Sequence, residues 1–189
     1  MRRKAVFLDR DGVINEDSGW IRRREDLDLF PFAGAAIRKL NARGWLAIVV
    51  SNQSAVAREL CTHDEIKRIH EELQVQLARA GARIDAIYYC PHHPDFGPVR
   101  DCDCRKPKTG MIDRGVEEFG IDRDQSFLIG DKTSDLLAGE RAGLKTILVR
   151  TGEGGRDQAY DVVPDVTVAD LTEAVNWILS DDIEQTERK

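Results

Sequence analysis

Short, continuous apolar segments recur along the chain, and polar or glycine-containing stretches separate them. A short apolar run that is followed by turn residues is typical of a strand buried on both faces of a sheet. The pattern therefore predicts strands at residues 5–8, 45–50, 86–89, 126–129, 146–149 and 166–168.

Between these runs, apolar residues recur every three or four positions, as they do on one face of a helix. The clearest example begins at the capping box Thr62–Glu65 and ends at Gly81. Glycines also follow three of the other helical segments, and glycine is typical of the position at which a helix ends. The expected helices cover residues 33–43, 63–80, 111–119, 134–142 and 171–179.

Strands that alternate with helices predict an α/β fold with a central parallel sheet and helices on both faces. We expect a single Rossmann-like, three-layer domain over residues 1–180, followed by a charged tail at 181–189. A chain of 189 residues is long enough for one well-packed domain, and no internal repeat or low-complexity segment divides it. Residues 14–32 are expected to be polar and irregular, and residues 150–161 to form a mobile, glycine-rich loop.

The composition disfavours several classes of protein. A net charge of -6 argues against broad binding to nucleic acid, which usually needs a basic surface. The basic residues 2–4 precede an apolar run that ends at Asp9, which is too short for the core of a signal peptide. No segment approaches the about 18 apolar residues of a membrane span. We therefore expect a cytoplasmic monomer with a small-molecule substrate and neither a nucleic-acid nor a membrane partner.

Residues capable of catalysis follow several of the predicted strands. The carboxyl ends of parallel strands lie at one edge of the sheet, where ligands of such folds bind. An Asp-x-Asp-Gly sequence alone is equally typical of an ordinary turn, so the set as a whole carries the prediction. The set is Asp9 and Asp11 after the first strand, Ser51 and Asn52 after the second, Arg105 and Lys106 in the loop after the third, and Asp131 and Lys132 after the fourth.

Carboxylates, a hydroxyl group and cations at one edge suit phosphoryl transfer, which depends on positioning and charge neutralisation. Carboxylates from two strands form a hard oxygen site that suits magnesium. One carboxylate can be the nucleophile, and a second can move the proton of the leaving oxygen. The sequence contains no Gly-x-x-x-x-Gly-Lys-Ser/Thr segment, which disfavours an ATP-binding P-loop.

The loop at residues 90–104 contains Cys90, His92, Cys102 and Cys104. Three thiolates and one imidazole suit a closed, tetrahedral zinc site, which would be structural because no position is open for water. The alternative is a set of ordinary buried cysteines beside a surface histidine. Spacing alone does not exclude His93 as the fourth ligand.

The remaining cysteine and histidines are expected to have no part in chemistry. Cys61 has no partner nearby in the sequence and is interpreted as a small packing residue. His63 and His70 lie on a predicted helix away from any strand end, and both are interpreted as surface residues.

Four segments, in this order, resemble the motifs of the haloacid-dehalogenase phosphatase superfamily, and in particular its histidinol-phosphate phosphatase-like family. The resemblance covers residues 4 to about 152. It implies that Asp9 is the nucleophile, that Asp11 is the general acid and base, and that Ser51 and Lys106 hold the transferring phosphate. The segments are Asp9-Arg10-Asp11-Gly12, Ser51-Asn52-Gln53, Arg105-Lys106-Pro107 and Gly130-Asp131-Lys132-Thr133-Ser134-Asp135.

The resemblance also implies the two metal sites. Magnesium would bind the Asp9 carboxylate, the backbone carbonyl of Asp11 and the Asp131 carboxylate. Structural zinc would bind the three cysteines together with His92 rather than His93. The insertions at residues 14–32 and 90–109 are too short to form the large cap domain that phosphomutases of the superfamily usually carry.

The substrate implied by the resemblance is a heptose 1,7-bisphosphate that loses its 7-phosphate. Histidinol phosphate is the alternative, a DNA-end phosphatase fits the acidic charge less well, and an inactive zinc-stabilised binding module is the competing class. The sequence departs from the family at Ser51, where relatives often carry threonine, and at Ala55 and Glu59, where glycine is common. The residues expected to bind substrate are Asp17, Ser18, Gly19, Trp20, Asn52, Gln53, Ser54, Arg105 and Lys132.

Overall fold

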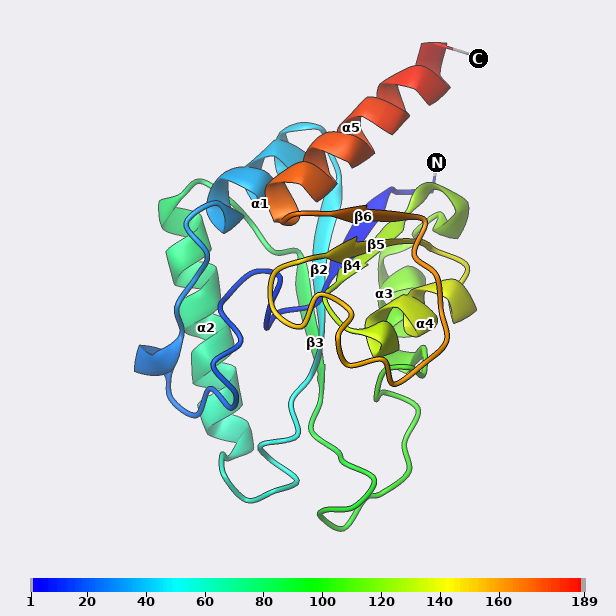
Figure 1. Cartoon of the computed structure of the whole chain (residues 1–189). Helices are drawn as coiled ribbons and strands as arrows, with labels where there is room; N and C mark the ends of the chain where they lie inside the picture. The colour runs from blue at the N-terminus through cyan, green and yellow to red at the C-terminus, as the bar shows by residue number, and fades with distance from the viewer. Residues whose placement is uncertain (1, 188–189) are drawn as a thin grey trace.

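The computed structural model of the chain describes residues 2–187. Within this range, six strands form one parallel sheet in the order β3-β2-β1-β4-β5-β6 (Figure 1). The predicted α/β fold with a central parallel sheet is confirmed. The strands are β1 (Ala5–Leu8), β2 (Leu46–Asn52), β3 (Ala86–Cys90), β4 (Phe127–Gly130), β5 (Lys145–Val149) and β6 (Val166–Val168).

Helices cover both faces of the sheet, which gives the three layers expected from the sequence. Helices α1, α2 and α5 pack on one face, and α3 and α4 pack on the other (Figure 1). The described helices are α1 (Ala33–Ala42), α2 (His63–Arg79), α3 (Gly110–Phe119), α4 (Thr133–Arg141), α5 (Leu171–Glu187) and two short 3₁₀ helices at Arg24–Asp26 and Arg123–Gln125.

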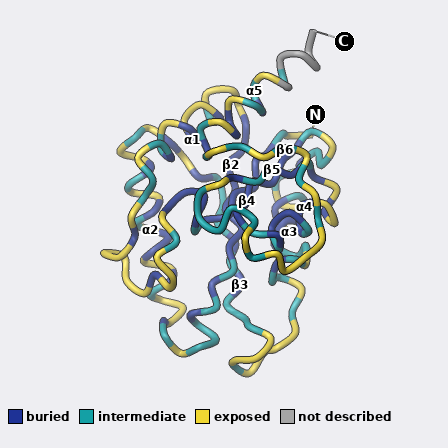
Figure 2. The backbone as a smooth tube through the Cα atoms, in the orientation of Figure 1, coloured by how far each residue is buried: buried dark blue, intermediate teal, exposed yellow. Residues whose placement is uncertain are grey.

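Strand β1 explains why the sequence contains continuous apolar runs. Val6 and Leu8 belong to the core cluster under α1, α2 and α5, whereas Ala5 and Phe7 belong to the cluster under α3 and α4. Successive side chains of a strand point to opposite faces, so a strand covered on both faces must be apolar throughout. Figure 2 shows the strands as the buried centre of the molecule and the loops as its exposed periphery.

The predicted capping box is present at the start of α2. The Thr62 side chain accepts a hydrogen bond from the backbone N–H of Glu65, and the Glu65 carboxylate accepts one from the backbone N–H of Thr62. These bonds satisfy two backbone donors that have no partner within the helix. The start of α2 is thus fixed by local chemistry that the sequence displays.

Two segments differ from the sequence prediction. Helix α5 continues through Glu187, whereas the apolar pattern ended at residue 179, because charged and glutamine residues extend a helix well when no glycine or proline stops it. Residues 14–32 are also less polar in their packing than expected, since Ile14, Ile21 and Leu27 enter the core.

The direction in which successive strands are added to the sheet reverses between β1 and β4. The chain moves outward from β1 to β2 and β3 on one side, and from β4 to β5 and β6 on the other. Such a switch leaves a crevice outside the carboxyl ends of the two central strands. Among the helices of residues 2–187, none is both long and apolar enough to cross a membrane.

Candidate active site

Lys106 lies among the charged groups at this crevice. Its Nζ is 2.9 Å from Oδ1 of Asp9 and 2.7 Å from Oδ1 of Asp135, and it donates a hydrogen bond of 2.7 Å to the carbonyl of Val50. Burial opposes the charge of this lysine, but Asp135 and Asp9 raise the pKa of Lys106 to about 12. The structure thus places a buried ammonium group directly against the predicted nucleophile.

Three carboxylates meet beside this lysine. One oxygen from each of Asp9, Asp131 and Asp135 lies within 4.8 Å of the others. Burial, Asp9 and Asp135 raise the pKa of Asp131 to about 8, and burial raises the pKa of Asp9 to about 6 against the effect of Lys106. Oδ1 of Asp131 is buried without a hydrogen-bond partner. A buried, under-compensated oxygen cluster of this kind fits a hard divalent cation such as magnesium.

Two glycines allow the backbone to approach Asp131. Gly12 has φ 82° and Gly152 has φ 59°, and a Cβ at either position would lie within 2.4 Å of Oδ2 of Asp131. The other residue at this point is Glu153, whose backbone N–H donates to Oδ2 at 2.8 Å. The glycine that follows the Asp-x-Asp motif is therefore required by the close approach of the two loops.

The second carboxylate of the motif is held by three side chains. Asp11 accepts hydrogen bonds from Nε and Nη2 of Arg10 at 2.9–3.0 Å, from Asn15 at 2.9 Å and from Gln53 at 2.8 Å. Burial acts to raise the pKa of Asp11, but Arg10 and the hydrogen bonds from Asn15 and Gln53 lower it below its usual value. These contacts favour the charged form of the carboxylate and fix its orientation.

The end of β2 positions two of these groups. Gln53 donates to the Ser51 hydroxyl at 2.8 Å as well as to Asp11. Asn52 binds both backbone groups of Lys106, since its amide donates to the carbonyl and its oxygen accepts from the N–H, each at 3.1 Å. Both amide side chains, predicted to bind substrate, therefore also connect motifs that lie far apart in the sequence.

The turn after β2 retains a backbone conformation that favours glycine. Glu59 has φ 57°, in the left-handed region that L-residues rarely adopt. This is one of the two positions at which the sequence lacks the glycine common in the family that it resembles. The backbone conformation that glycine favours is present here although the residue is glutamate.

The predicted substrate loops lie around the crevice. Asp17 forms an ion pair with Lys132 at 3.0 Å. Trp20, 47% exposed, lies 5.2 Å from the guanidinium of Arg58, which also packs against the ring of Phe96 at 4.0 Å. Arg58 thereby connects the loop of residues 17–20 to the loop that follows β3, a role that sequence reasoning missed.

A basic cavity of about 290 Å³ lies beside Lys106. Arg105 lines it and also donates to the carbonyl of His92 at 3.0 Å, so its side chain extends along the loop that follows β3. Positive charge from several elements suits a second anionic group of a substrate. The charged residues that line this cavity are Arg100, Asp101, Arg105, Lys106, Lys108 and Arg141.

The cysteine and histidine side chains of the loop meet at one point. The three sulfur atoms lie 3.0–3.6 Å apart, and Nδ1 of His92 is 3.4 Å from Sγ of Cys104. Tetrahedral zinc with a zinc–sulfur distance of about 2.3 Å would separate its sulfur ligands by about 3.8 Å. This cluster of Cys90, His92, Cys102 and Cys104 could therefore hold zinc.

His93 lies in a different environment from His92. Its Nε2 lies 3.0 Å from a guanidinium nitrogen of Arg58, and its Nδ1 accepts a hydrogen bond from the backbone N–H of Asp95. The structure therefore separates the two histidines that spacing left equivalent, and only His92 joins the cysteines. Cys61 is buried in the apolar core, as expected of a packing residue.

One histidine prediction was wrong. His70 is 8% exposed rather than on the surface, and its Nε2 lies 3.3 Å from Nη1 of Arg10. The signal was present in the sequence, because His70 follows Ile66 by four positions and precedes Leu73 by three, which places it on the apolar face of α2. His63 is exposed, as expected.

Asp135 belongs to the fourth motif of the sequence, but sequence reasoning gave it no role in the site. It lies in the first turn of α4, where its carboxylate also accepts a hydrogen bond from the backbone N–H of Lys132 at 3.0 Å. Its contact with Lys106 joins residues 29 positions apart in the sequence. Only the packing of α4 against the end of β4 brings them together.

The glycine-rich loop after β5 is hydrogen-bonded to the site at several points. Thr151 donates to the carbonyl of Gly12 at 2.6 Å, and the backbone N–H of Gly155 donates to the carbonyl of Asp131 at 2.8 Å. Asp157 accepts from both the backbone and the hydroxyl of Thr133. These bonds connect the loop, predicted to be mobile, to the metal-ligand candidate and to the start of α4.

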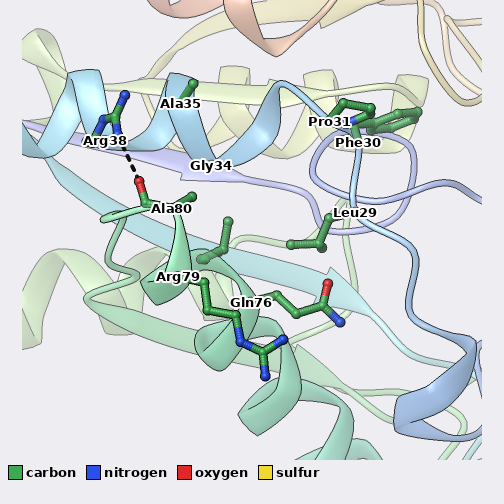
Figure 3. A pocket seen from close by; sticks show the side chains of 10 residues that line it. Leu29, Phe30, Pro31, Gly34, Ala35, Arg38, Gln76, Arg79 and Ala80 are labelled. Carbon is green, nitrogen blue, oxygen red and sulfur yellow. Dashed lines mark hydrogen bonds between the residues drawn. The ribbon is translucent and has the colours of Figure 1, made fainter.

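A separate hollow lies between α1 and α2 (Figure 3). Arg38, Gln76 and Arg79 line it together with apolar residues, and Arg38 donates to the carbonyl of Ala80 at 3.2 Å. No residue of the predicted site is among the residues described around it. We therefore place the chemistry at the carboxyl edge of the sheet.

Comparisons with known proteins show which family the chain is similar to. A family described as "HAD-hyrolase-like" matches residues 103–174. The D-glycero-beta-D-manno-heptose-1,7-bisphosphate 7-phosphatase of Pasteurella multocida is 40% identical, over 94% of this chain and 100% of that protein. The D-glycero-D-manno-heptose-1,7-bisphosphate 7-phosphatase of Thermosynechococcus vestitus is 42% identical, over 94% of this chain and 96% of that protein.

A solved structure is also similar over nearly the whole chain. The D,D-heptose 1,7-bisphosphate phosphatase from B. bronchiseptica, determined in complex with magnesium and phosphate, gives a TM-score of 0.85 at 32% identity. The match covers 94% of this chain and 99% of that one.

Proposed function

The chain belongs to the heptose 1,7-bisphosphate 7-phosphatase family of HAD-like hydrolases, and from this premise we propose that it removes the 7-phosphate of D-glycero-D-manno-heptose 1,7-bisphosphate. The observation that carries the proposal is the buried arrangement of Asp9, Lys106 and Asp131 at the carboxyl edge of the sheet. The product, heptose 1-phosphate, would be a precursor of activated heptose for lipopolysaccharide or S-layer synthesis.

Two carboxylates perform the proposed chemistry. Asp9 attacks phosphorus, and the bond between phosphorus and the sugar oxygen breaks as an aspartyl-phosphate forms. Asp11 takes up a proton from solvent before this step and donates it to the leaving oxygen; the carboxylate then accepts a proton from the water that hydrolyses the aspartyl-phosphate, which restores the acid form. Ser51 and Lys106 bind the phosphate oxygens during both steps. The contact between Lys106 and Asp9 at 2.9 Å supports this assignment.

The proposed magnesium ligands are the Asp9 carboxylate, the backbone carbonyl of Asp11 and the Asp131 carboxylate. When bound, the ion would neutralise charge on the phosphate oxygens. The buried Oδ1 of Asp131, which has no hydrogen-bond partner, supports the assignment. Asp135 is proposed to hold Lys106 rather than to bind magnesium, because its Oδ1 lies 2.7 Å from the ammonium group of that lysine.

Zinc is proposed to have a structural function in the loop of residues 90–104. Its four ligands would complete a tetrahedral shell, which leaves no position for a reacting water. The ligand Cys104 directly precedes Arg105 and Lys106 in the sequence. A fixed Cys104 would therefore fix the direction in which these two cations leave the loop.

The second phosphate of the substrate is proposed to bind in the basic cavity, with Arg105 as its main contact. The planar guanidinium group binds the oxygen atoms of a phosphate in pairs. Residues 17–20, Asn52, Gln53, Ser54 and Lys132 would surround the sugar. The heptose names of the relatives favour this substrate over histidinol phosphate.

A comparison of substrates tests this function. We expect kcat/KM for heptose 1,7-bisphosphate to exceed that for histidinol phosphate by about 100-fold or more, which corresponds to about 3 kcal/mol. Arg105→Ala should remove most of this preference. Arg38→Ala, which changes an arginine in the hollow between α1 and α2, is the matched control and should leave the preference unchanged.

A higher kcat/KM for histidinol phosphate would contradict the proposal and favour the alternative substrate. An inactive zinc-stabilised binding module would hydrolyse neither substrate. Asp9, Asp11 and Asp131 are all present, which argues against such a module. A monomeric state and a cytoplasmic location remain predictions.

A further inference from the structure

His70 is a buried histidine that the proposed chemistry does not use. It lies on the face of α2 that packs against the sheet, and its ring meets the ring of Tyr89 edge-on at 5.3 Å. Burial, with Arg10 as the next cause, lowers the pKa of His70 to about 3. The imidazole is therefore neutral near pH 7, and its Nε2 can accept a hydrogen bond from Nη1 of Arg10, 3.3 Å away.

Arg10 is the group that connects His70 to the catalytic motif. Its side chain is 1% exposed, and each nitrogen of the guanidinium has a partner. Nε and Nη2 donate to Asp11, Nη2 also donates to Gln53 at 3.0 Å, and Nη1 faces His70. A planar group with contacts on all three nitrogens cannot rotate without losing several hydrogen bonds at a buried site.

We propose that His70 is a positioning residue which, through Arg10, orients the Asp11 carboxylate toward the oxygen of the leaving group. The inference rests on the proposed phosphatase activity and adds a residue to it. His70 would touch neither the substrate nor the reacting atoms. Without its acceptor, Nη1 of Arg10 would lose a partner, and the guanidinium would lose the contact that fixes it on the side away from Asp11.

The proposed role affects one part of the reaction more than the others. As the bond between phosphorus and the leaving oxygen breaks, the electron pair stays on that oxygen, and a proton from Asp11 neutralises it. An alkoxide is a strong base and needs this proton, whereas p-nitrophenolate is stable without it. A misplaced Asp11 should therefore slow the hydrolysis of alkyl phosphates more than that of aryl phosphates.

The test measures kcat/KM for heptose 1,7-bisphosphate and for p-nitrophenyl phosphate, because kcat/KM reports only the steps through phosphoryl transfer. In His70→Leu, we expect a loss of about 10–100-fold with the sugar phosphate, which is part of the about 10²–10⁴-fold contributed by proton transfer, and a loss of less than about 3-fold with the aryl phosphate. His70→Gln, which can still accept a hydrogen bond, should recover most of the loss.

Ile69→Val is the matched control. Ile69 is the neighbouring residue of α2, is fully buried in the core, and has an aliphatic side chain that cannot accept a hydrogen bond from Arg10. This change should alter kcat/KM for both substrates by the same small factor. If His70→Leu does not fold, Arg10→Lys is measured in the same way, because lysine retains the positive charge but cannot contact Asp11, Gln53 and His70 through three separate nitrogen atoms.

An equal loss with both substrates in His70→Leu, or no loss with either, would overturn the inference. If the wild-type protein prefers another alkyl phosphate, such as histidinol phosphate, the proposed substrate fails and the same ratio is measured with that ester. The substrate and the positioning role are thus tested separately.

Discussion

Within residues 2–187 the molecule contains two clusters of potential metal ligands, and they differ in how far the polar groups of each cluster have partners. At the end of the central strands, Asp9, Asp131 and Asp135 are almost fully buried beside Lys106, and one oxygen of Asp131 has no partner. In the loop after β3, three sulfur atoms and one imidazole nitrogen face one another at 3.0–3.8 Å.

The difference indicates what each cluster can do. The carboxylate cluster holds like charges in a buried site, so it gains from a cation and from any further group that arrives with it, such as a phosphate. The cysteine and histidine cluster offers four ligands, which is a complete shell for zinc. The proposed role of the first cluster is catalysis and that of the second is stability, and separate substitutions should distinguish these two roles.

The largest expected effect is the loss of activity in Asp9→Asn. The change keeps the size of the side chain and removes the nucleophilic charge, so the rate of phosphate release should fall by more than about 10⁴-fold. Zinc content and the free energy of unfolding should change little by comparison. Substantial magnesium-dependent turnover in this variant would show that Asp9 is not the nucleophile.

The second effect concerns the zinc cluster. We expect the wild type to contain about one zinc per chain and Cys102→Ser to lose most of it. If free zinc exceeds the dissociation constant of the wild-type site 1,000-fold, the free energy of unfolding should be lower in the variant by about 4 kcal/mol. Elemental analysis and denaturant unfolding measure the two quantities. Cys61→Ser is the control, because Cys61 lies in the core and should leave zinc content unchanged. Normal folding of zinc-free wild-type protein would rule out a structural metal.

The third predicted effect is an increase in stability, whereas most substitutions of buried residues decrease it. In the presence of a chelator at pH 8, Asp131→Asn should stabilise the metal-free protein by about 1–4 kcal/mol, because it removes a buried carboxyl that Asp9 and Asp135 repel. The folded-state pKa of Asp131 is raised to about 8, so its contribution to stability is present below about pH 4 and lost as the pH rises through 8. The gain should therefore be small at pH 4. A variant less stable than the wild type at pH 8 would contradict this account.

The smallest effect concerns His70, whose contribution to stability should depend on pH with the opposite sign to that of Asp131. The pKa of His70 is lowered to about 3 by burial and by Arg10, while Asp11 nearby acts to raise it. Between pH 3 and 6.5 the unfolded state alone binds this proton, so stability should fall as the pH decreases, by at most about 1.4 kcal/mol per unit. His70→Gln should remove that slope in unfolding measurements. An unchanged slope would mean that the histidine titrates normally in the folded protein.

Much of the fold was predictable because burial on a sheet or helix leaves a local periodic signal. The apolar runs predicted all six strands, and the capping box predicted the start of α2. The boundary of α5 was not predicted, since a polar helix end leaves no apolar period to read. His70 was misplaced because the argument used distance from a strand end and overlooked its position on the apolar face of α2.

The sequence by itself determined which residues stand at the strand ends, because a parallel sheet brings the carboxyl ends of its strands to one edge. It also determined the four-ligand composition of the loop after β3. Only the tertiary structure decided that Lys106 meets Asp135 and that His70 reaches Arg10. It also places His92 beside the cysteines, where spacing left His93 open and only the resemblance favoured His92. The contact between Lys106 and Asp135 and the contact between His70 and Arg10 join residues 29 and 60 positions apart. Contacts over such separations are set by how helices and loops pack on the sheet, which no local pattern records.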